Sequence, residues 1–244
     1  AGTDPGGRPL TFQGLALPPW LNVVQVGGSS AIIRTFAGTG VLGVPTNGLP
    51  ATNTPVGYVY GMVHDQAGNL YCADYNTHYV YKITPAGIIT RIAGNGTATS
   101  SGDGGPATSA GIKNPMDVAL DAAGNLYIAE YGGHKIRKVD LDGNIRTVAG
   151  TGYNSYSADG KPATNSYLSY PASVVVDPAG NLYISDQGNK RIRRVNTAGI
   201  IRTVAGTGTN GYNGDGIAAT NASFVTLRDI TMDAAGNLYI ADGS

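Results

Sequence analysis

The tetrapeptide Ala-Gly-Asn-Leu occurs four times, always at the same interval along the chain. A second marker, Ala-Gly-x-Gly, recurs with the same step. A fixed period through most of a chain indicates a repeat architecture. Residues present in every repeat are expected to build the scaffold, and residues that break the repeat are candidates for specificity. The asparagines of the first marker are Asn69, Asn125, Asn181 and Asn237, and the second marker begins at Ala37, Ala93, Ala149 and Ala205.

The best-formed repeat predicts four short strands, at residues 116–121, 125–130, 134–140 and 144–149. Turns that contain Gly or Asp separate them, and Asp65, Asp121, Asp177 and Asp233 are predicted to cap the first turn of each repeat. Four such strands in an antiparallel meander make one blade of a β-propeller. Charged residues are only 13% of the chain and glycines number 37, which suits a β protein rich in turns. The predicted fold class is therefore all-β, a propeller of four-stranded antiparallel blades built from four 56-residue repeats.

The repeat resembles the NHL-repeat family of propellers. The resemblance is carried by Gly124-Asn125-Leu126-Tyr127-Ile128-Ala129, by Gly133-His134-Lys135-Ile136-Arg137, and by the matching residues 180–192. It covers about residues 22–244. It implies a propeller, usually of about six blades. It does not imply one activity, since the family includes ligand-binding modules, adhesion modules and a few enzymes.

The chain ends within its fourth repeat. Complete blades are predicted at about 57–93, 115–149 and 171–205, whereas residues 225–242 supply only two strands. Residues 22–37 match the missing two strands with a one-residue gap. Joining the termini in one split blade would remove exposed sheet edges. We therefore predict one domain over 22–244, closed by that blade and preceded by an extension at 1–21. A four-bladed monomer and an eight-bladed ring shared by a homodimer are both compatible with this pattern.

Long connections between the blades predict one elaborated face. They lie at 38–57, 94–114, 150–170 and 206–226, and most propeller connections are much shorter. Three of them place an acid beside a glycine, and Asn47 stands at this position in the first. Capping of a turn explains these acids. Calcium is the alternative, although each loop offers one carboxylate only. The acids are Asp103, Asp159 and Asp215.

The first strand of each repeat begins with residues that differ between repeats: Tyr60-Gly61, Met116-Asp117, Ala172-Ser173 and Arg228-Asp229. These positions are expected near the channel. Arginine could bind a carboxylate with two hydrogen bonds, and tyrosine could stack on a sugar. An internal ion pair of Arg228 with Asp117 or Asp229 is the alternative. The candidate ligand-binding residues are Tyr60, Asp117, Arg228, Asp229, Tyr75, Tyr131, Tyr156 and Tyr212.

Two further sets of charged residues recur with the period. An acid ends the second strand of each repeat, which predicts a structural hydrogen bond to a neighbouring blade; a ring of acids that holds a cation or polyol is the alternative. Basic residues of the third strand are predicted to form a solvated outer face. The acids are Asp74, Glu130, Asp186 and Asp242; the basic residues are Lys135, Arg137, Lys138, Arg191, Arg193 and Arg194.

Catalytic residue types are few. The three histidines, His64, His78 and His134, do not form a three-ligand zinc site, and His64 is expected to be packed. Cys72 aligns with isoleucines of the other repeats and is predicted to be a core residue. No nucleophile–base pair and no phosphate-binding loop are visible.

The sequence therefore favours a non-enzymatic scaffold that binds a protein or a carbohydrate, with calcium as the only candidate cofactor. Basic and acidic residues both number 16, which gives no reason to expect nucleic acid as a partner. No apolar run could span a membrane, and no secretory signal stands at the start. Low charge suggests an extracellular or periplasmic location.

One alternative to a binding scaffold is a lyase or hydrolase acting on a carbohydrate or lactone through Asp117, Arg228 and Asp229. Another is a bare scaffold, truncated or engineered from a longer propeller.

Overall fold

The structure is a computed structural model, and it describes residues 35–243. Three four-stranded antiparallel sheets follow one another, and a two-stranded sheet comes last. The first sheet contains β1 (Val59–His64), β2 (Leu70–Asp74), β3 (Tyr79–Ile83) and β4 (Ile89–Ala93). The second contains β5 (Pro115–Leu120), β6 (Leu126–Glu130), β7 (Lys135–Val139) and β8 (Ile145–Ala149). The third contains β9 (Pro171–Val176), β10 (Leu182–Asp186), β11 (Arg191–Val195) and β12 (Ile201–Ala205), and the last contains β13 (Leu227–Met232) and β14 (Leu238–Asp242).

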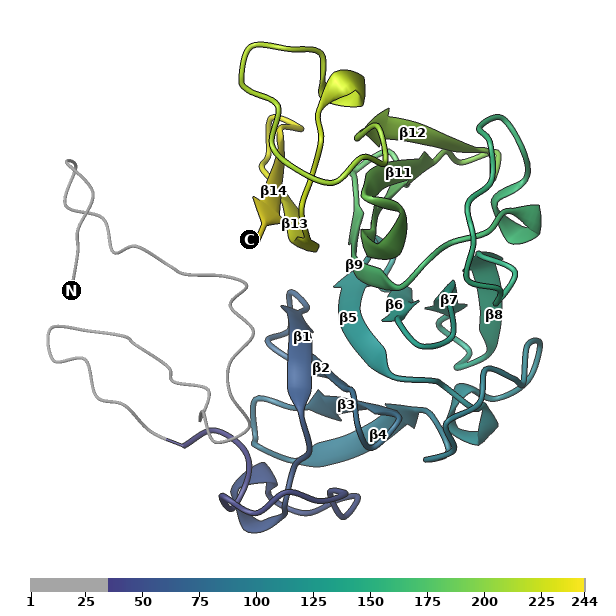
Figure 1. Ribbon diagram of the computed structural model, residues 1–244. Coiled ribbons are helices and arrows are strands. Elements are labelled where there is room, and N and C mark those ends of the chain that lie inside the picture. Colours follow the sequence, from purple (N-terminus) through teal and green to yellow (C-terminus); the bar gives the residue numbers. More distant parts are fainter. Residues whose placement is uncertain (1–34, 244) are drawn as a thin grey trace, which may run out of the picture.

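The sheets are arranged around an axis as blades (Figure 1). The first strand of each blade lies innermost, and β1, β5, β9 and β13 pack on one another in that order. This arrangement confirms the predicted all-β propeller. The predicted extension at 1–21 and most of the N-terminal half of the split blade fall outside the described residues. No helix in the part of the chain that the structure describes is long and apolar enough to cross a membrane.

The core lies between blades rather than within one sheet. Ala73 and Val80 of the first blade pack in one cluster with Val118 and Ile128 of the second. The predicted burial of Cys72 is confirmed, since it is 4% exposed. Each blade therefore buries its apolar side chains against its neighbours, and a single blade would leave them in water.

The Ala-Gly-Asn-Leu marker builds the turn between the first two strands of each blade. Gly124 adopts a φ of +90°, a backbone conformation that is costly for residues with a Cβ. Asp121 accepts a hydrogen bond from the backbone N–H of Asn125 at 2.9 Å and one from its side-chain amide at 2.7 Å. The predicted turn-capping role of these aspartates is confirmed. The same contacts recur at Asp65, Asp177 and Asp233.

The Ala-Gly-x-Gly marker lies where the outer strand leaves the sheet. Gly150 has a φ of +88°, and its N–H donates to the carbonyl of Ala163 at 2.9 Å. A Cβ at Gly150 would lie 2.2 Å from the carbonyl oxygen of His134. Glycine is therefore required both for the backbone angle and for the close approach of two chain segments.

The long connections fold on the outer side of the propeller. Each contains a 3-10 turn, and these turns lie at its periphery (Figure 1). The N–H of Ala107 donates to Gly143 at 2.8 Å, and that of Ile145 donates to Gly105 at 2.9 Å, which ties the connection to the start of β8. The sequence predicted that the connections form one elaborated face. This prediction is wrong for the middle of each connection, where the 3-10 turn lies at the periphery. The twist of the sheets carries the outer strands away from the axis, so the connections fill the outer gaps between blades. The turns are η1 (Ala51–Asn53), η2 (Ala107–Ser109), η3 (Ala163–Asn165) and η5 (Ala219–Asn221).

Two glycine substitutions test this account of the second marker. We expect Gly150→Ala to lower the free energy of unfolding by more than about 2 kcal/mol, because the left-handed angle costs about 1–2 kcal/mol and the clash with His134 adds to it. Gly143→Ala is the matched control. Its φ is +80°, but no atom lies within 4 Å of the added Cβ, so only the cost of the angle should appear. Urea unfolding measures both, and equal losses would contradict the steric argument.

Candidate functional site

A β-bulge interrupts the first strand of every blade at the position where the repeats differ. Pro115 pairs with Glu130 and Asp117 pairs with Ala129, so Met116 is the extra residue. A bulge re-aims the side chains beside it, and bulges are common next to functional sites. The four symmetry-breaking positions thus coincide with a structural irregularity at the end of the axis where the first strands begin. We call this end the mouth. Its bulge residues are Tyr60, Met116, Ala172 and Arg228.

Four tyrosines form a continuous row across three blades at the mouth. The ring centroids of Tyr60 and Tyr75 are 5.3 Å apart, those of Tyr75 and Tyr131 6.1 Å, and those of Tyr131 and Tyr170 5.0 Å. Tyr60 and Tyr170 are 36% and 38% exposed, so the row is accessible to a ligand. We call these four residues the tyrosine arc. Three of them are sequence candidates, and Tyr170 is an addition.

Tyr170 and Gln187 are the residues of this surface that sequence reasoning missed. The Tyr131 hydroxyl donates to the side-chain oxygen of Gln187 at 2.9 Å, and Gln187 Nε2 donates to the carbonyl of Leu227 at 2.7 Å. The arc is thereby connected to the last blade. A signal was present in the sequence, since both residues also differ between repeats. Tyr170 stands where Tyr58, Asn114 and Thr226 lie, and Gln187 where Tyr75, Tyr131 and Gly243 lie.

Beside the arc, three polar side chains from successive blades meet along the axis. The Ser173 hydroxyl oxygen lies 2.7 Å from Asp117 Oδ2 and 2.7 Å from Asp229 Oδ1. The backbone N–H of Val174 also donates to Asp117 Oδ2, at 2.9 Å. A Cβ on Gly61, the equivalent residue of the first blade, would lie 2.3 Å from Asp117 Oδ1, so glycine is needed for this approach. The predicted proximity of Asp117 and Asp229 is thus explained by a shared serine.

A count of the donors available to Ser173, Asp117 and Asp229 indicates that one carboxyl is protonated. One hydroxyl has one hydrogen and can donate to only one of two carboxylates. The other short contact of the serine oxygen therefore requires a hydrogen on Asp117 or Asp229. Desolvation, together with the like charge of Asp229, raises the pKa of Asp117 to about 7, while hydrogen bonds from Val174 and Ser173 act in the opposite direction. Near neutral pH the pair consequently carries less negative charge than two free carboxylates.

The predicted internal ion pair of Arg228 is not among the ion pairs of residues 35–243. Arg228 is exposed, and its Nε lies 2.8 Å from the position that a Cβ on Gly243 would occupy. Its positive charge also acts on Tyr131 of the arc. Arg228 therefore presents its guanidinium at the mouth, near the tyrosines.

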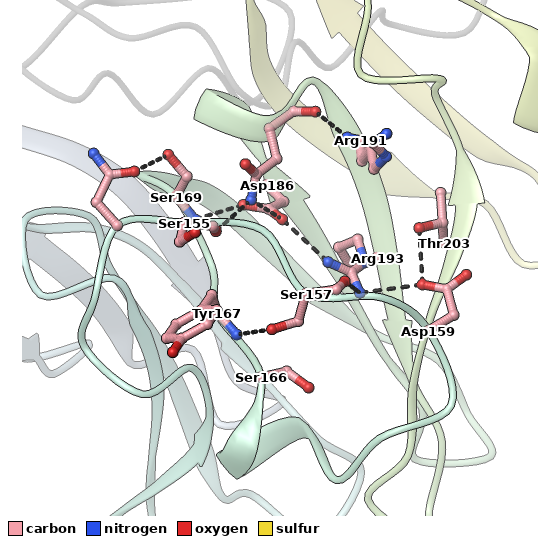
Figure 2. Close-up of polar contacts among 12 residues, drawn as sticks. Ser155, Ser157, Asp159, Ser166, Tyr167, Ser169, Asp186, Arg191, Arg193 and Thr203 are labelled. Carbon is pink, nitrogen blue, oxygen red and sulfur yellow. Dashed lines mark hydrogen bonds and ion pairs between the residues drawn. The ribbon is translucent and has the colours of Figure 1, made fainter.

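Away from the mouth, a buried arginine ties each of two connections to the blade that follows it. In the third blade, Arg193 lies between Asp186, at 3.5 Å, and Asp159, at 3.2 Å (Figure 2). Arg193 also donates to the carbonyl of Ser157 at 3.2 Å, and Thr203 donates to Asp159 at 3.0 Å. Burial raises the pKa of Asp186 to about 6, although Arg193 and two other hydrogen-bond donors oppose that rise. The connection is therefore held by charge as well as by backbone bonds.

The second blade repeats this clamp. Arg137 is 0% exposed and contacts Asp103 at 2.5 Å and Glu130 at 3.2 Å. The guanidinium also donates to the carbonyl of Ser101 at 3.1 Å. The prediction of a solvated face is therefore wrong for Arg137 and Arg193, because the connection folds over the third strand and removes these side chains from water. A sequence signal existed: in both repeats the arginine follows the acid at the same spacing of 34 positions, whereas the first repeat has Asn47 and Tyr81 at the two places.

The calcium candidates are engaged in other contacts. Asp103 and Asp159 pair with the buried arginines, so a calcium ion would have to replace a guanidinium. Asp215 bonds to the Tyr212 hydroxyl, which raises the pKa of that phenol. Within residues 35–243 no three His, Cys, Asp or Glu side chains converge in a manner that could hold a metal ion.

The two candidate tyrosines of the connections lie apart from the arc. Tyr156 stacks on Arg191, whose guanidinium carbon is 4.2 Å from the ring centroid. Tyr212 is 71% exposed on the last connection. The structure therefore brings Tyr60, Tyr75, Tyr131, Asp117, Arg228 and Asp229 to one end of the axis, and it leaves Tyr156 and Tyr212 elsewhere.

The acids that end the second strands are structural, but they bond within their own blade. Glu130 accepts a hydrogen bond from the N–H of Lys113 at 2.6 Å, and Asp186 accepts one from the N–H of Ser169 at 2.7 Å. Asp74 and Asp242 do the same for the residues that enter β1 and β13. The prediction that these acids bond to a neighbouring blade is thus wrong, because they accept N–H groups at the entry to their own blade. Asp74, Glu130 and Asp186 are each 0% exposed, so they form no open ring of acids.

Two histidines also form hydrogen bonds between neighbouring blades at the mouth. His134 Nδ1 accepts a hydrogen bond from the N–H of Tyr170 at 3.1 Å, and His78 Nδ1 accepts one from Asn114 at 3.2 Å. Only a neutral imidazole can accept in this way. Desolvation and the charge of Lys113 lower the pKa of both histidines, which favours that form. His64 is exposed, so the prediction that it is packed is wrong.

The recurrent blade is matched by known sequence families. The profile of the Teneurin NHL domain matches residues 39–158, and that of the NHL repeat matches residues 168–195; together they cover more than half of the chain. The chain belongs to the NHL-repeat family. Among curated NHL relatives, Teneurin-1 of Gallus gallus is 28% identical over 205 residues, and Teneurin-m of Drosophila melanogaster is 31% identical over 134. These alignments cover 75% and 48% of this chain, but only 7% and 5% of the teneurins.

Solved structures share the fold of this NHL chain. A protein of unknown function from Bacteroides thetaiotaomicron has a TM-score of 0.60 at 20% identity, over 75% of this chain and 44% of that one. An auxiliary nutrient binding protein from Bacteroides ovatus has a TM-score of 0.58 at 23% identity, over 78% and 46%. The Nidogen/Laminin complex contains a match with a TM-score of 0.52 at 19% identity, over 76% and 57%. The chain spans about half the length of these structures.

The buried clamp predicts unequal effects for two arginines of one blade. Arg137→Met should lower the free energy of unfolding by about 3–5 kcal/mol, because Glu130 would lose the guanidinium that neutralises its buried charge and keep only its hydrogen bonds from Lys113 and Ser100. Arg146→Met is the control, since Arg146 is exposed on β8 and its replacement should change stability by less than about 0.5 kcal/mol. The double variant Asp103→Asn/Arg137→Tyr, which copies the first blade, should lose less than Arg137→Met. Urea unfolding measures the free energy of unfolding of each variant. Equal losses for Arg137→Met and Arg146→Met would refute the stabilising role of the clamp.

The axial carboxyls predict a dependence of stability on pH. The folded pKa of Asp117 is about 7, above the unfolded value of about 3.9, so the folded state binds more protons between these values. The free energy of unfolding should therefore fall as pH rises from 4 to 7. Asp229→Asn removes the like charge, lowers the pKa of Asp117 and should reduce this fall by up to about 1.4 kcal/mol, one pKa unit.

Urea unfolding at pH 5 and pH 8 measures the difference between wild type and Asp229→Asn. The raised pKa of Asp186 and the lowered pKa values of the histidines contribute to both proteins and cancel in the comparison. Asp142→Asn, at an exposed turn, is the control and should leave the pH dependence unchanged. An identical pH dependence in Asp229→Asn and wild type would show that the two carboxyls do not interact.

Proposed function

We propose that this chain is a recognition module and that it binds its ligand at the mouth, across the tyrosine arc. The observation that carries the proposal is the unbroken row of four tyrosines over three blades, beside the exposed Arg228. Tyrosine offers a large rigid surface at low entropic cost together with a polar hydroxyl, which is why binding surfaces are rich in it. Scaffold residues recur in every repeat, whereas a tyrosine stands at each of these positions in only one or two of the four repeats.

The clamps support the choice of the mouth over the connections. Buried ion pairs fix the centres of two connections against the outer strands, where they stabilise the propeller. The mouth has a different architecture, since bulges re-aim Tyr60 and Arg228 at the ends of their strands. Tyr75 and Tyr131 directly follow β2 and β6, and Tyr170 directly precedes β9, so the scaffold holds these side chains in place before the ligand arrives, which reduces the entropic cost of binding.

The location of the module is proposed to be extracellular or periplasmic. The similarity to teneurins and to proteins named auxiliary nutrient binding proteins supports it. The low content of charged residues is compatible with this location. Binding of a protein or of a carbohydrate is consistent with the same relatives, since another similar structure is a complex of nidogen with laminin.

An enzymatic role has one observation in its favour. A pKa of about 7 for Asp117 suits a general acid or base. However, both oxygens of Asp117 accept backbone N–H groups, from Val118 at 2.8 Å and from Val174 at 2.9 Å. A substrate would have to compete with these bonds for the carboxyl group. We therefore prefer binding to a lyase or hydrolase activity through Asp117, Asp229 and Arg228.

A binding screen tests the proposed function. The full chain is presented to a glycan array and to a displayed library of extracellular proteins, in parallel with the double variant Tyr75→Ala/Tyr131→Ala. We expect ligands of the wild type to lose at least tenfold in affinity with the variant, because truncating central aromatic residues typically costs about 2 kcal/mol or more. Circular dichroism and thermal unfolding confirm that the variant is folded.

Tyr239→Ala is the control variant. Tyr239 is 57% exposed and bonds to Asp233 at the turn between the first two strands, at the opposite end of the blade from the mouth. It should retain every ligand. Ligands that the double variant keeps and Tyr239→Ala loses would place binding elsewhere, and the absence of any ligand for the wild type would favour a bare scaffold.

A further inference from the structure

We infer that the ligand of the mouth is an acidic oligosaccharide, whose sugar rings lie on the tyrosine arc and whose carboxylate binds Arg228. This inference deepens the proposed function and rests on it. It is drawn from the accessible charge at the mouth, from the width of the arc and from the polarity of its rings. Each of these is a property of described residues.

The accessible charge at the mouth is positive. Arg228 and Lys113 are exposed, and neither forms an ion pair with a carboxylate within residues 35–243. Lys113 lies beside the arc, because its Cγ is 3.2 Å from the position of a Cβ on Gly132, the residue after Tyr131. An exposed guanidinium presents several parallel donors, which match a carboxylate with two hydrogen bonds.

Of the four acids at the blade entries near the mouth, three are directed inward and the fourth, Asp242, is exposed. Asp74, Glu130 and Asp186 are fully buried and accept backbone N–H groups at the entry to their blades. On the axis, the serine between Asp117 and Asp229 requires a shared hydrogen, so this pair carries a reduced charge. An approaching ligand therefore meets two cations, the neutral phenols and one exposed carboxylate, that of Asp242, whose oxygens both accept the N–H of Val225. The accessible charge is net positive and complementary to an anion.

The dimensions of the arc favour a sugar chain over a folded protein. The arc is one side chain wide, and its rings follow one another at 5.0–6.1 Å, a step similar to the length of one pyranose unit. A stable protein interface needs about 800 Å² on each partner, which calls for a broad surface. A row of separate rings instead suits a ligand that is a chain of small units.

The rings combine an apolar surface with hydrogen-bonding groups, as a sugar requires. Desolvation, with a smaller contribution from the neighbouring tyrosines, raises the pKa of Tyr75 and Tyr131, so both phenols stay protonated. Protonated hydroxyls can both donate to and accept from sugar hydroxyls. Gln187 and Tyr131 already bond to each other, which fixes the ring of Tyr131 in place.

Isothermal titration calorimetry on the full chain tests the inference. The probes are a galacturonic acid hexasaccharide and a sialic acid hexasaccharide, each beside its methyl ester, in which the sugars are unchanged but the carboxylates are neutral. We expect at least one acid form to bind at least tenfold more tightly than its ester and to weaken as salt is added. Arg228→Gln should remove this tenfold preference and leave the affinity for the ester unchanged.

Variants of the arc separate stacking from charge. Tyr131→Ala should weaken acid and ester alike, whereas Arg202→Gln, at an exposed position of β12, should weaken neither. The inference is overturned by equal affinity for acid and ester, by binding of none of the four probes, or by a hexaglutamate peptide that binds as tightly as the sugars. If these probes fail while the library screen yields protein ligands that need Tyr75 and Tyr131, the inference is wrong and the proposed function stands.

Discussion

The structure depends on a guanidinium buried between a connection and the blade that follows it. Arg137 and Arg193 are fully buried, and each pairs with an acid of its own blade and with an acid of the preceding connection. A buried charge is strongly unfavourable without partners, so the connection must be in place before the arginine is satisfied. The clamp thereby couples the fold of a long surface segment to the packing of neighbouring blades. The first blade has Tyr81 and Asn47 at these positions, so it lacks both the acid and the base of the clamp.

The clamped parts of the connections stabilise the fold, and the proposed binding surface at the mouth lies apart from them. Clamps and 3-10 turns hold the centres of the connections at the outer rim, and only the inner ends of the connections, such as Tyr170, reach the mouth. Bulges in the first strands supply the rest of its surface, by aiming Tyr60 and Arg228 out of the regular strand geometry. Of the arc, Tyr60 lies on a strand, whereas Tyr75, Tyr131 and Tyr170 lie directly beside the ends of β2, β6 and β9. Residues at these places can vary between repeats without disturbing the core between the blades.

Sequence reasoning predicted the repeated elements well and the long-range contacts poorly. The strands, the capping aspartates such as Asp121 and the buried Cys72 follow from local patterns, and all three are confirmed. Six of the eight candidate ligand-binding residues do lie together at the mouth, because symmetry-breaking positions of one strand share one end of the axis. The predicted solvation of Arg137 and Arg193 is wrong, since period-two alternation does not reveal that a distant segment covers the outer strands.

The sequence by itself determined the period, the blade and its turns, because each rests on residues close in the chain: Gly124 supplies a left-handed angle, and Asp121 caps the turn beside it. Only the tertiary structure decided where the connections lie, which residue satisfies each acid, and that Asp117 and Asp229 share Ser173. These contacts join residues 17 to 57 positions apart. Their partners are set by the twist of the blades and their rotation about the axis, and neither quantity is encoded in a local pattern.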